Sequence, residues 1–214
     1  MSEVPFECQK AWDYIDEIYQ EKDRPRMKDF INAAGVDAFG PTIEDELARL
    51  FKLLLNVVRP KRVLEIGMSI GFSTTHLALV AKRFGGTVTT IEIDESIVAD
   101  ARRAFERGGV SGIIEIIIGD AKEVISEMDS ESFDVVFQDS TKTLYPIMLE
   151  DCIRVLKPGG LFLVDDTLFP VIRPPSEWTE GDRAIDKFNR DLLEYNVESA
   201  ILPIGEGCTI AVKL

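Results

Sequence analysis

The stretch Arg62-Val-Leu-Glu-Ile-Gly-Met-Ser-Ile-Gly-Phe-Ser-Thr-Thr75 decides the fold of this chain. Its first half is apolar and β-branched and ends at Gly67, and Gly71 then opens a helical pattern from Phe72 to Phe84. The pattern predicts a strand, a glycine turn and a helix, a unit in which backbone N–H groups at the helix N-terminus face a ligand. The spacing Gly67-x-x-x-Gly71 differs from the Gly-x-Gly-x-x-Gly of dinucleotide-binding proteins, and no lysine follows as in a P-loop.

Two carboxylates flank this turn in the predicted fold. Glu65 precedes the turn, and Glu92 lies near the end of the next predicted strand, 87–93. A carboxylate at the end of that second strand suits a ribose diol, because two hydroxyl donors can share its acceptor oxygens. The pattern therefore favours a nucleoside ligand without a pyrophosphate, and S-adenosylmethionine fits that description. Glu65 is expected either to orient the turn or to contact this cofactor.

The composition is that of an ordinary globular protein, with 214 residues of which 45% are hydrophobic and 29% charged. A net charge of −14 argues against nucleic acid as a partner, because phosphates need a basic surface. The cysteines Cys8, Cys152 and Cys208 form no C-x-x-C pair and indicate neither a disulfide framework nor a zinc site. No apolar run approaches the ~20 residues of a membrane span, and the N-terminus has no apolar core of signal-peptide type. We therefore expect a cytoplasmic protein with no nucleic-acid or membrane partner.

Helices are expected in the N-terminal part of the chain. Apolar residues recur at helical spacing over 12–19, and a second helix is predicted from about Thr42, a plausible N-cap, to Val58. We therefore divide the chain into an N-terminal helical extension, 1–60, and a cofactor-binding domain, 61–214, packed together as one structural domain.

Strands and helices alternate after residue 61. The predicted strands are 62–66, 87–93, 113–118, 133–138 and 160–164, and the predicted helices are 72–84, 95–107, 121–128, 144–156 and 183–195. Near-continuous Val, Ile and Leu in the strands predicts a parallel sheet covered on both faces. The segments 199–204 and 208–214 flank Gly205-Glu206-Gly207 and are predicted to form a hairpin, and 169–181 is expected to be an irregular substrate loop. The fold class is α/β: a doubly wound, mostly parallel seven-stranded sheet with a C-terminal antiparallel hairpin and N-terminal helices. This predicted arrangement resembles the Rossmann-like sheet of class I S-adenosylmethionine-dependent methyltransferases.

Further acidic residues follow two of the predicted strands. Asp139 follows strand 133–138, and Asp165 and Asp166 follow strand 160–164. In a doubly wound sheet these strands are neighbours, so their carboxyl ends meet at the edge where ligands bind. Three carboxylates so close would repel unless a cation joins them, and an all-oxygen set suits Mg²⁺, Mn²⁺ or Ca²⁺. Each acid could instead cap the helix that follows its strand.

From about residue 41 onward, the chain resembles the metal-dependent O-methyltransferases of the catechol and caffeoyl-CoA type, including their small bacterial and archaeal members. The segments that carry the resemblance are Val63-Leu-Glu-Ile-Gly with Gly71-Phe-Ser73, Ile91-Glu-Ile-Asp94, Gly119-Asp-Ala121, Gln138-Asp-Ser-Thr-Lys142, Val164-Asp-Asp-Thr-Leu168 and Arg183-Ala-Ile-Asp-Lys-Phe-Asn189. The resemblance implies a small hydroxylated acceptor and a homodimer.

The resemblance also implies roles for individual residues. The methionine end of the cofactor would be lined by Gly67, Ser69, Gly71 and Ser73, the ribose would be held by Glu92, and the adenine by Asp120 and Ala121. Asp139, Asp165 and Asp166 match the metal ligands, Asp139 also borders the cofactor, and Lys142 matches the catalytic base. The last ligand of the family is usually Asn, so Asp166 adds a negative charge to the site.

The function expected from this pattern is metal-assisted methyl transfer to a vicinal-diol aromatic acceptor. The divalent ion would orient two vicinal oxygens, and the pKa of Lys142 would be lowered by the cation and the sulfonium. The only histidine, His76, is expected to be a packing or surface residue rather than a base. A methyltransferase without metal and a non-catalytic cofactor-binding protein remain as alternatives, and a nicotinamide oxidoreductase is disfavoured by the glycine spacing.

Overall fold

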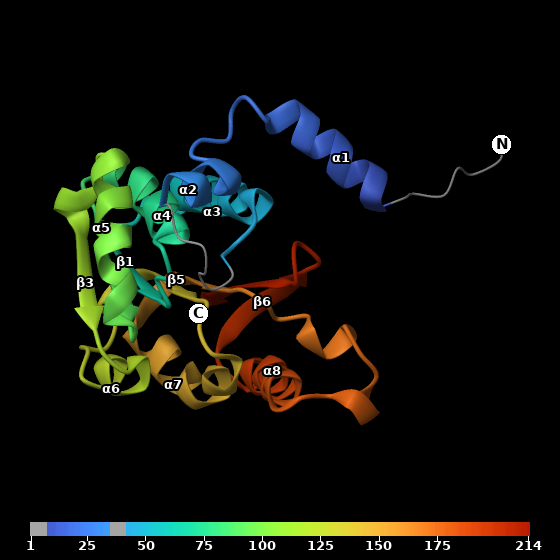
Figure 1. The fold of residues 1–214 in the computed structure, drawn as a ribbon. Coiled ribbons are helices and arrows are strands. Elements are labelled where there is room, and N and C mark those ends of the chain that lie inside the picture. Colours follow the sequence, from blue (N-terminus) through green and yellow to red (C-terminus); the bar gives the residue numbers. More distant parts are fainter. Residues whose placement is uncertain (1–7, 35–41) are drawn as a thin grey trace.

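The computed structural model describes residues 8–34 and 42–214 and contains one mixed sheet between two layers of helices (Figure 1). The strands are β1 Arg62–Ile66, β2 Thr87–Glu92, β3 Ile114–Ile118, β4 Phe133–Gln138, β5 Leu156–Val164, β6 Val197–Leu202 and β7 Cys208–Lys213. The α-helices are α1 Cys8–Tyr19, α2 Met27–Ala34, α3 Asp45–Val58, α4 Phe72–Ala81, α5 Val98–Arg107, α6 Ala121–Ser126, α7 Tyr145–Val155 and α8 Glu180–Asp191. Short 3₁₀ helices are η1 Lys82–Phe84, η2 Glu95–Ile97, η3 Ser111–Ile113, η4 Lys142–Leu144, η5 Phe169–Val171, η6 Pro175–Glu177 and η7 Leu192–Glu194.

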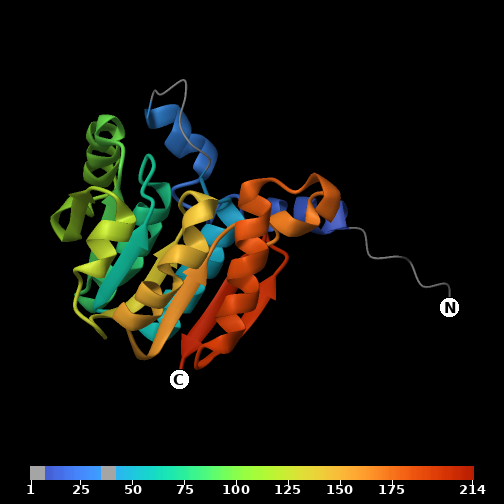
Figure 2. The same ribbon diagram turned by 90° about the horizontal axis from the view of Figure 1, so that it is seen from below.

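The sheet has the order β3-β2-β1-β4-β5-β7-β6. The first five strands run parallel, and β7 pairs antiparallel with both β5 and β6, which confirms the predicted fold class and its terminal hairpin. Figure 2 shows the red hairpin at one edge of the sheet and the green strands at the other. The strand order reverses between β1 and β4, and ligands bind at such a point, beyond the carboxyl ends of the strands.

Alternate side chains of the strands build two separate cores. Val63 of β1 packs with α3, α4 and α5 on one face, and its neighbour Leu64 packs with α6, α7 and α8 on the other. Figure 1 shows these two groups of helices on opposite sides of the sheet. Phe51 of α3 meets Phe137 of β4 edge-on with ring centroids 4.8 Å apart, so α3 is part of the first core. The division into 1–60 and 61–214 stays a prediction, and residues 1–7 and 35–41 lie outside the described residues.

Two local predictions were wrong, and one helix was not predicted. The N-cap of α3 is Glu44 rather than Thr42, and no side chain caps the helix; Asp45 and Glu46 in its first turn complement the helix dipole instead. The eight-residue helix α2 was not predicted, because so short a helix carries little periodic signal. The segment 169–181 is not irregular throughout: it contains η5 and η6, and α8 begins at Glu180 behind a Thr179 capping box. Among the helices within residues 8–34 and 42–214, none is long and apolar enough to cross a membrane.

His76 is a packing residue, as expected. His76 lies on α4, and its side chain is buried. Its Nε2 lies 3.1 Å from the carbonyl oxygen of Pro25, and its ring meets that of Phe72 edge-on with ring centroids 4.7 Å apart. Burial, with the nearby charge of Lys52, lowers the pKa of His76 to about 4. The side chain therefore stays neutral in the folded protein at neutral pH.

This burial predicts a pH-dependent loss of stability. The unfolded chain binds a proton at His76 near pH 6.5, whereas the folded chain does so only near pH 4, so the contribution of His76 is lost as the pH falls between these values. His76→Gln keeps an N–H donor but does not titrate. The free energy of unfolding of the wild type should fall relative to that of the variant by up to ~3 kcal/mol between pH 7 and pH 4. Urea unfolding at each pH measures this difference, and parallel curves for the two proteins would contradict it.

Candidate active site

The predicted acids Asp139, Asp165 and Asp166 converge at the carboxyl ends of β4 and β5. Each contributes a carboxylate oxygen, and these oxygens all lie within 4.8 Å of one another. The hydrogen-bond ladder of the sheet continues past the ends of β4 and β5. The backbone N–H of Asp139 donates to the carbonyl of Ile66, and that of Asp165 donates to the carbonyl of Gln138. Consecutive side chains of a strand point to opposite faces, but Asp166 has a left-handed backbone with φ of 61°. The left-handed backbone at Asp166 occurs where its carboxylate lies close to that of Asp165.

The three carboxylates form a strongly negative site. Burial, reinforced by the charges of Asp139 and Asp166, raises the pKa of Asp165 to about 9. Burial also raises the pKa of Asp139, although Lys142 opposes this shift. Asp165 is only 5% exposed; its Oδ1 accepts from the backbone N–H of Asp166, and its Oδ2 has no donor among the described residues. An all-oxygen set whose charge the protein compensates only in part fits a hard divalent cation.

Lys142 lies against these acids. Its Nζ donates to Asp139 Oδ1 at 3.1 Å and to the Tyr145 hydroxyl at 3.0 Å, and it forms an ion pair with Asp166. Burial alone would lower the pKa of Lys142, but Tyr145, Asp139 and Asp166 together raise it. The lowered pKa expected from the sequence rests on positive charges that the chain does not supply, and the chain's own charges act in the opposite direction. Sequence reasoning missed the buried Tyr145, although its position three residues after Lys142 brings both to one turn.

A cavity of about 250 Å³ lies beyond β1, β2 and β4. Its walls include six residues predicted to bind the cofactor: Gly67, Ser69, Glu92, Asp120, Ala121 and Asp139. Ser140, Thr141 and Leu144 complete the side towards Lys142. The other three predicted residues, Glu65, Gly71 and Ser73, are buried around the turn behind it. Their contact with a cofactor stays a prediction.

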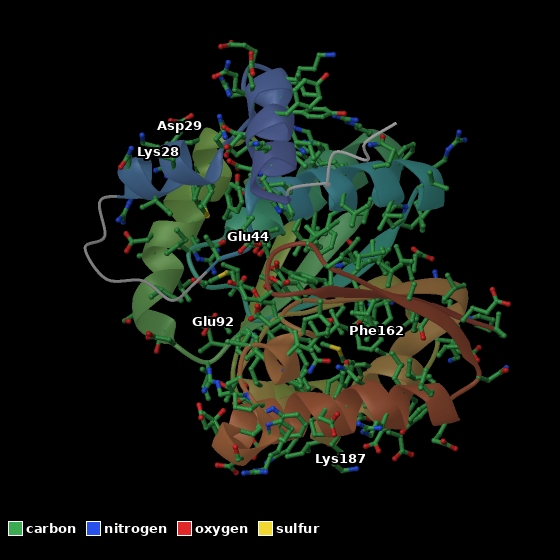
Figure 3. All side chains as sticks on the ribbon, turned by 90° about the vertical axis from the view of Figure 1, so that its right-hand side faces the viewer. Lys28, Asp29, Glu44, Glu92, Phe162 and Lys187 are labelled. Carbon is green, nitrogen blue, oxygen red and sulfur yellow. The ribbon has the colours of Figure 1, made fainter. Side chains whose placement is uncertain are left out.

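Glu92, whose side chain is labelled in Figure 3, is fixed by backbone donors. Its Oε2 accepts from Met68 and Ser69 of the glycine turn, and its Oε1 accepts from Ile93 and Asp94. The carboxylate therefore ties the end of β2 to the turn after β1. A carboxylate has about four acceptor positions, and these four N–H groups already occupy those of Glu92. Any further donor to Glu92 would therefore share an oxygen with a backbone N–H group.

Glu65 is buried on β1, just before the same turn. Its Oε2 accepts from the hydroxyls of Thr74 and Thr90, whereas its Oε1 has no partner among the described residues. Burial raises the pKa of Glu65 to about 7, although hydrogen bonds from Ser73 and both threonines oppose the shift. Asp120 has a local role as well, because its Oδ1 caps α6 by accepting from the backbone N–H of Lys122 at 2.9 Å.

A second cavity, of about 350 Å³, lies on the other side of Asp139. It is lined by Thr42, Glu44, Asp139, Asp165, Asp166, Phe169, Ile172, Arg173 and Glu206. Burial raises the pKa of Glu44 to about 7. A backbone hydrogen bond opposes this rise, whereas the interaction with Glu206 and the charge of Asp166 add to it. Sequence reasoning missed Glu44, Arg173 and Glu206, since they come from distant segments without a local motif. A larger cavity of about 450 Å³ beside Phe30 and Leu79 contains none of the strand-end acids.

Comparison with known proteins identifies the family. A family model described as O-methyltransferase matches residues 17–214 of this chain. The chain therefore belongs to this O-methyltransferase family. The caffeoyl-CoA O-methyltransferase of Stellaria longipes is 28% identical over 178 residues, which cover 78% of this chain and 73% of that protein.

Solved structures share the fold over nearly the whole chain. The O-methyltransferase from Bacillus cereus, in complex with SAH, has a TM-score of 0.81 at 21% identity and covers 96% of this chain and 99% of its own. TomG, an O-methyltransferase from Streptomyces achromogenes involved in tomaymycin synthesis and solved in complex with SAM, has a TM-score of 0.81 at 22% identity; the coverage is 97% of this chain and 99% of that one.

The contact between the glycine turn and Asp139 predicts a sharp effect of one methyl group. A Cβ at Gly67, whose φ is 94°, would lie 1.9 Å from the carbonyl oxygen of Asp139. Gly67→Ala should therefore lower the free energy of unfolding by more than about 3 kcal/mol or prevent folding. Gly109→Ala is the matched control: its φ is 63° with no atom within 4 Å of the added Cβ, so it should cost only ~1–2 kcal/mol. Equal losses in urea unfolding would contradict the prediction.

Proposed function

We propose that this protein transfers a methyl group from S-adenosylmethionine to one hydroxyl of a small aromatic acceptor with two vicinal hydroxyls, assisted by a divalent cation. The observation that carries the proposal is the position of Asp139. It lines both the cavity bordered by the glycine turn and the cavity that contains the acids. A donor in one cavity and an acceptor in the other would meet there, and catalysed transfer requires such alignment.

The first cavity is proposed to hold the cofactor. Gly67 and Ser69 would face the methionine end, Glu92 the ribose, and Asp120 with Ala121 the adenine. Glu65, Gly71 and Ser73 would support this end of the site or contact it directly. The SAM and SAH complexes of the two structural neighbours support the proposal, as does the absence of a Cβ at Gly67, which permits the close approach of the turn to Asp139.

Asp139, Asp165 and Asp166 are the proposed ligands of the cation, with Mg²⁺ the first candidate and Mn²⁺ or Ca²⁺ as alternatives. When bound, such an ion orients two vicinal oxygens and lowers the pKa of the hydroxyl that reacts. The charge of the three carboxylates, which Lys142 compensates only in part, supports this assignment, because burial and mutual repulsion already drive the pKa of Asp165 upward.

Lys142 is the proposed acceptor of the hydroxyl proton. Asp139 and Tyr145 hold its Nζ from two sides, so its position is fixed before the acceptor arrives. Lys142 can accept a proton only in its neutral form. Positive charge brought into the neighbouring cavities lowers its pKa towards that form.

A homodimer is proposed as well. Exposed apolar side chains occur on α1, where Tyr14 is 63% exposed, and on α3, where Leu53 and Val57 are 63% and 75% exposed. Figure 1 shows α1 extending away from the rest of the chain. A second copy could cover these side chains and stabilise the dimer through apolar burial.

Removal of the metal tests the role of the three aspartates. After treatment with EDTA and desalting, turnover of 4-ethylcatechol with labelled methyl donor should fall to background, and added Mg²⁺ should restore it. The control is binding of S-adenosylmethionine by calorimetry, which should persist in EDTA. Full turnover in excess EDTA would reject the metal and leave a metal-independent methyltransferase.

Replacement of Lys142 tests the proposed base. Lys142→Ala should lower kcat by about 10²–10⁴, because a positioned base contributes on that scale, and should change the Kd for S-adenosylmethionine far less. Lys28→Ala, at an exposed lysine on α2 (Figure 3), is the matched control and should leave both constants unchanged. A loss confined to cofactor affinity would assign Lys142 to binding and not to proton transfer.

A further inference from the structure

The second cavity carries two acidic side chains that the proposed metal site does not use. Glu44 comes from the start of α3, and Glu206 from the turn between β6 and β7. Within residues 8–34 and 42–214, the only group of three or more acids with ligand atoms close enough for one ion is Asp139, Asp165 and Asp166. Glu44 and Glu206 therefore form a separate acidic wall of the same cavity.

This wall is held in place by the backbone. The turn that carries Glu206 is fixed by two hydrogen bonds, from the N–H of Leu168 to the carbonyl of Glu206 at 2.8 Å and from the N–H of Thr167 to that of Gly207 at 2.9 Å. A Cβ at Gly205 would lie 2.5 Å from Glu44 Oε2, so the carboxyl group of Glu44 packs directly against the turn. The carboxyl group of Glu44 and the backbone of Glu206 are thus positioned by tertiary contacts.

Little positive charge in the cavity balances this wall. Arg173 lines the cavity, but its Nη1 lies 3.4 Å from Asp182 Oδ2, which already neutralises part of its charge. Asp165, at 5% exposure, adds an oxygen without a hydrogen-bond donor among the described residues. The remaining walls include the apolar side chains Phe169 and Ile172, which suit an aromatic ring.

We propose that Glu44 and Glu206 determine acceptor specificity and select a vicinal-diol aromatic acceptor that carries an ammonium group. The hydroxyls would face the strand-end aspartates, the ring would lie along Phe169 and Ile172, and the ammonium would lie between the two glutamates. Each of the two carboxyl groups offers acceptor oxygens to an ammonium, and hydrogen bonds between charged groups are stronger than those between neutral ones. An acceptor with a carboxylate or phosphate tail meets like charge at the same wall. This inference rests on the proposed methyl transfer.

Three probes with the same ring test the inference in the Mg²⁺-loaded, full-length enzyme. They are dopamine with an ammonium tail, 4-ethylcatechol with a neutral tail and 3,4-dihydroxyphenylpropionate with a carboxylate tail. The expected order of kcat/KM is dopamine, then 4-ethylcatechol, then the acid. In the double variant Glu44→Gln/Glu206→Gln, the ratio of dopamine to the acid should fall about tenfold or more, because close charge pairs contribute on that scale.

Glu198→Gln is the matched control, because it removes the same charge from an exposed position on β6, outside the cavity. Its ratio of dopamine to the acid should equal that of the wild type. The single variant Glu206→Gln, at an exposed turn, should give a smaller fall in the ratio and serves if the double variant does not fold.

The outcomes separate the inference from the proposed function. Equal kcat/KM for dopamine and the acid in the wild type, or a ratio unchanged by the glutamate variants, would overturn the inference while methyl transfer stands. A preference for dopamine that disappears at high Mg²⁺ would assign the glutamates to a second metal ion and also overturn it. No turnover of any of the three probes would overturn both the proposed acceptor class and the inference.

Discussion

The parallel pairing of β4 with both β1 and β5 holds Asp139 at the junction of two cavities. Its backbone N–H continues the ladder to Ile66, and its carbonyl lies so close to Gly67 that a methyl group would not fit between them. The same register places Asp165 beside it at the end of β5. The cavity proposed for the cofactor, the acid cluster and the contact with Lys142 all depend on this one arrangement of strand ends.

Electrostatic imbalance is the second property of the site. Buried carboxylates cost free energy when they are charged and unpaired, and the raised pKa values of Asp165 and Glu44 reflect that cost. Lys142 offsets only part of it through Asp139 and Asp166, and Arg173, which lines the second cavity, pairs with Asp182. A site with this excess of negative charge favours positively charged ligands. The net charge of −14 adds to this attraction over longer distances.

Local sequence patterns predicted the strands and most helices because burial on both faces leaves near-continuous apolar runs. They also predicted the meeting of Asp139, Asp165 and Asp166, since residues that follow neighbouring parallel strands reach one edge. They failed for α2 and for the start of α3, where a short helix and an uncapped N-terminus give weak signals. They also failed for the charge balance around Lys142, which depends on Tyr145 and Asp166 as neighbours in space.

The sequence by itself determined the strand–turn–helix unit, the parallel sheet with its terminal hairpin, and the acids at the strand ends. Each of these follows from residue type and spacing within one segment. Only the tertiary structure decided that Glu44, Arg173 and Glu206 share a cavity with those acids. It also decided that Glu92 is held by four backbone donors from two segments. The physical reason is that contacts between segments far apart in the chain depend on how whole elements pack, and periodicity within a segment carries no record of that packing.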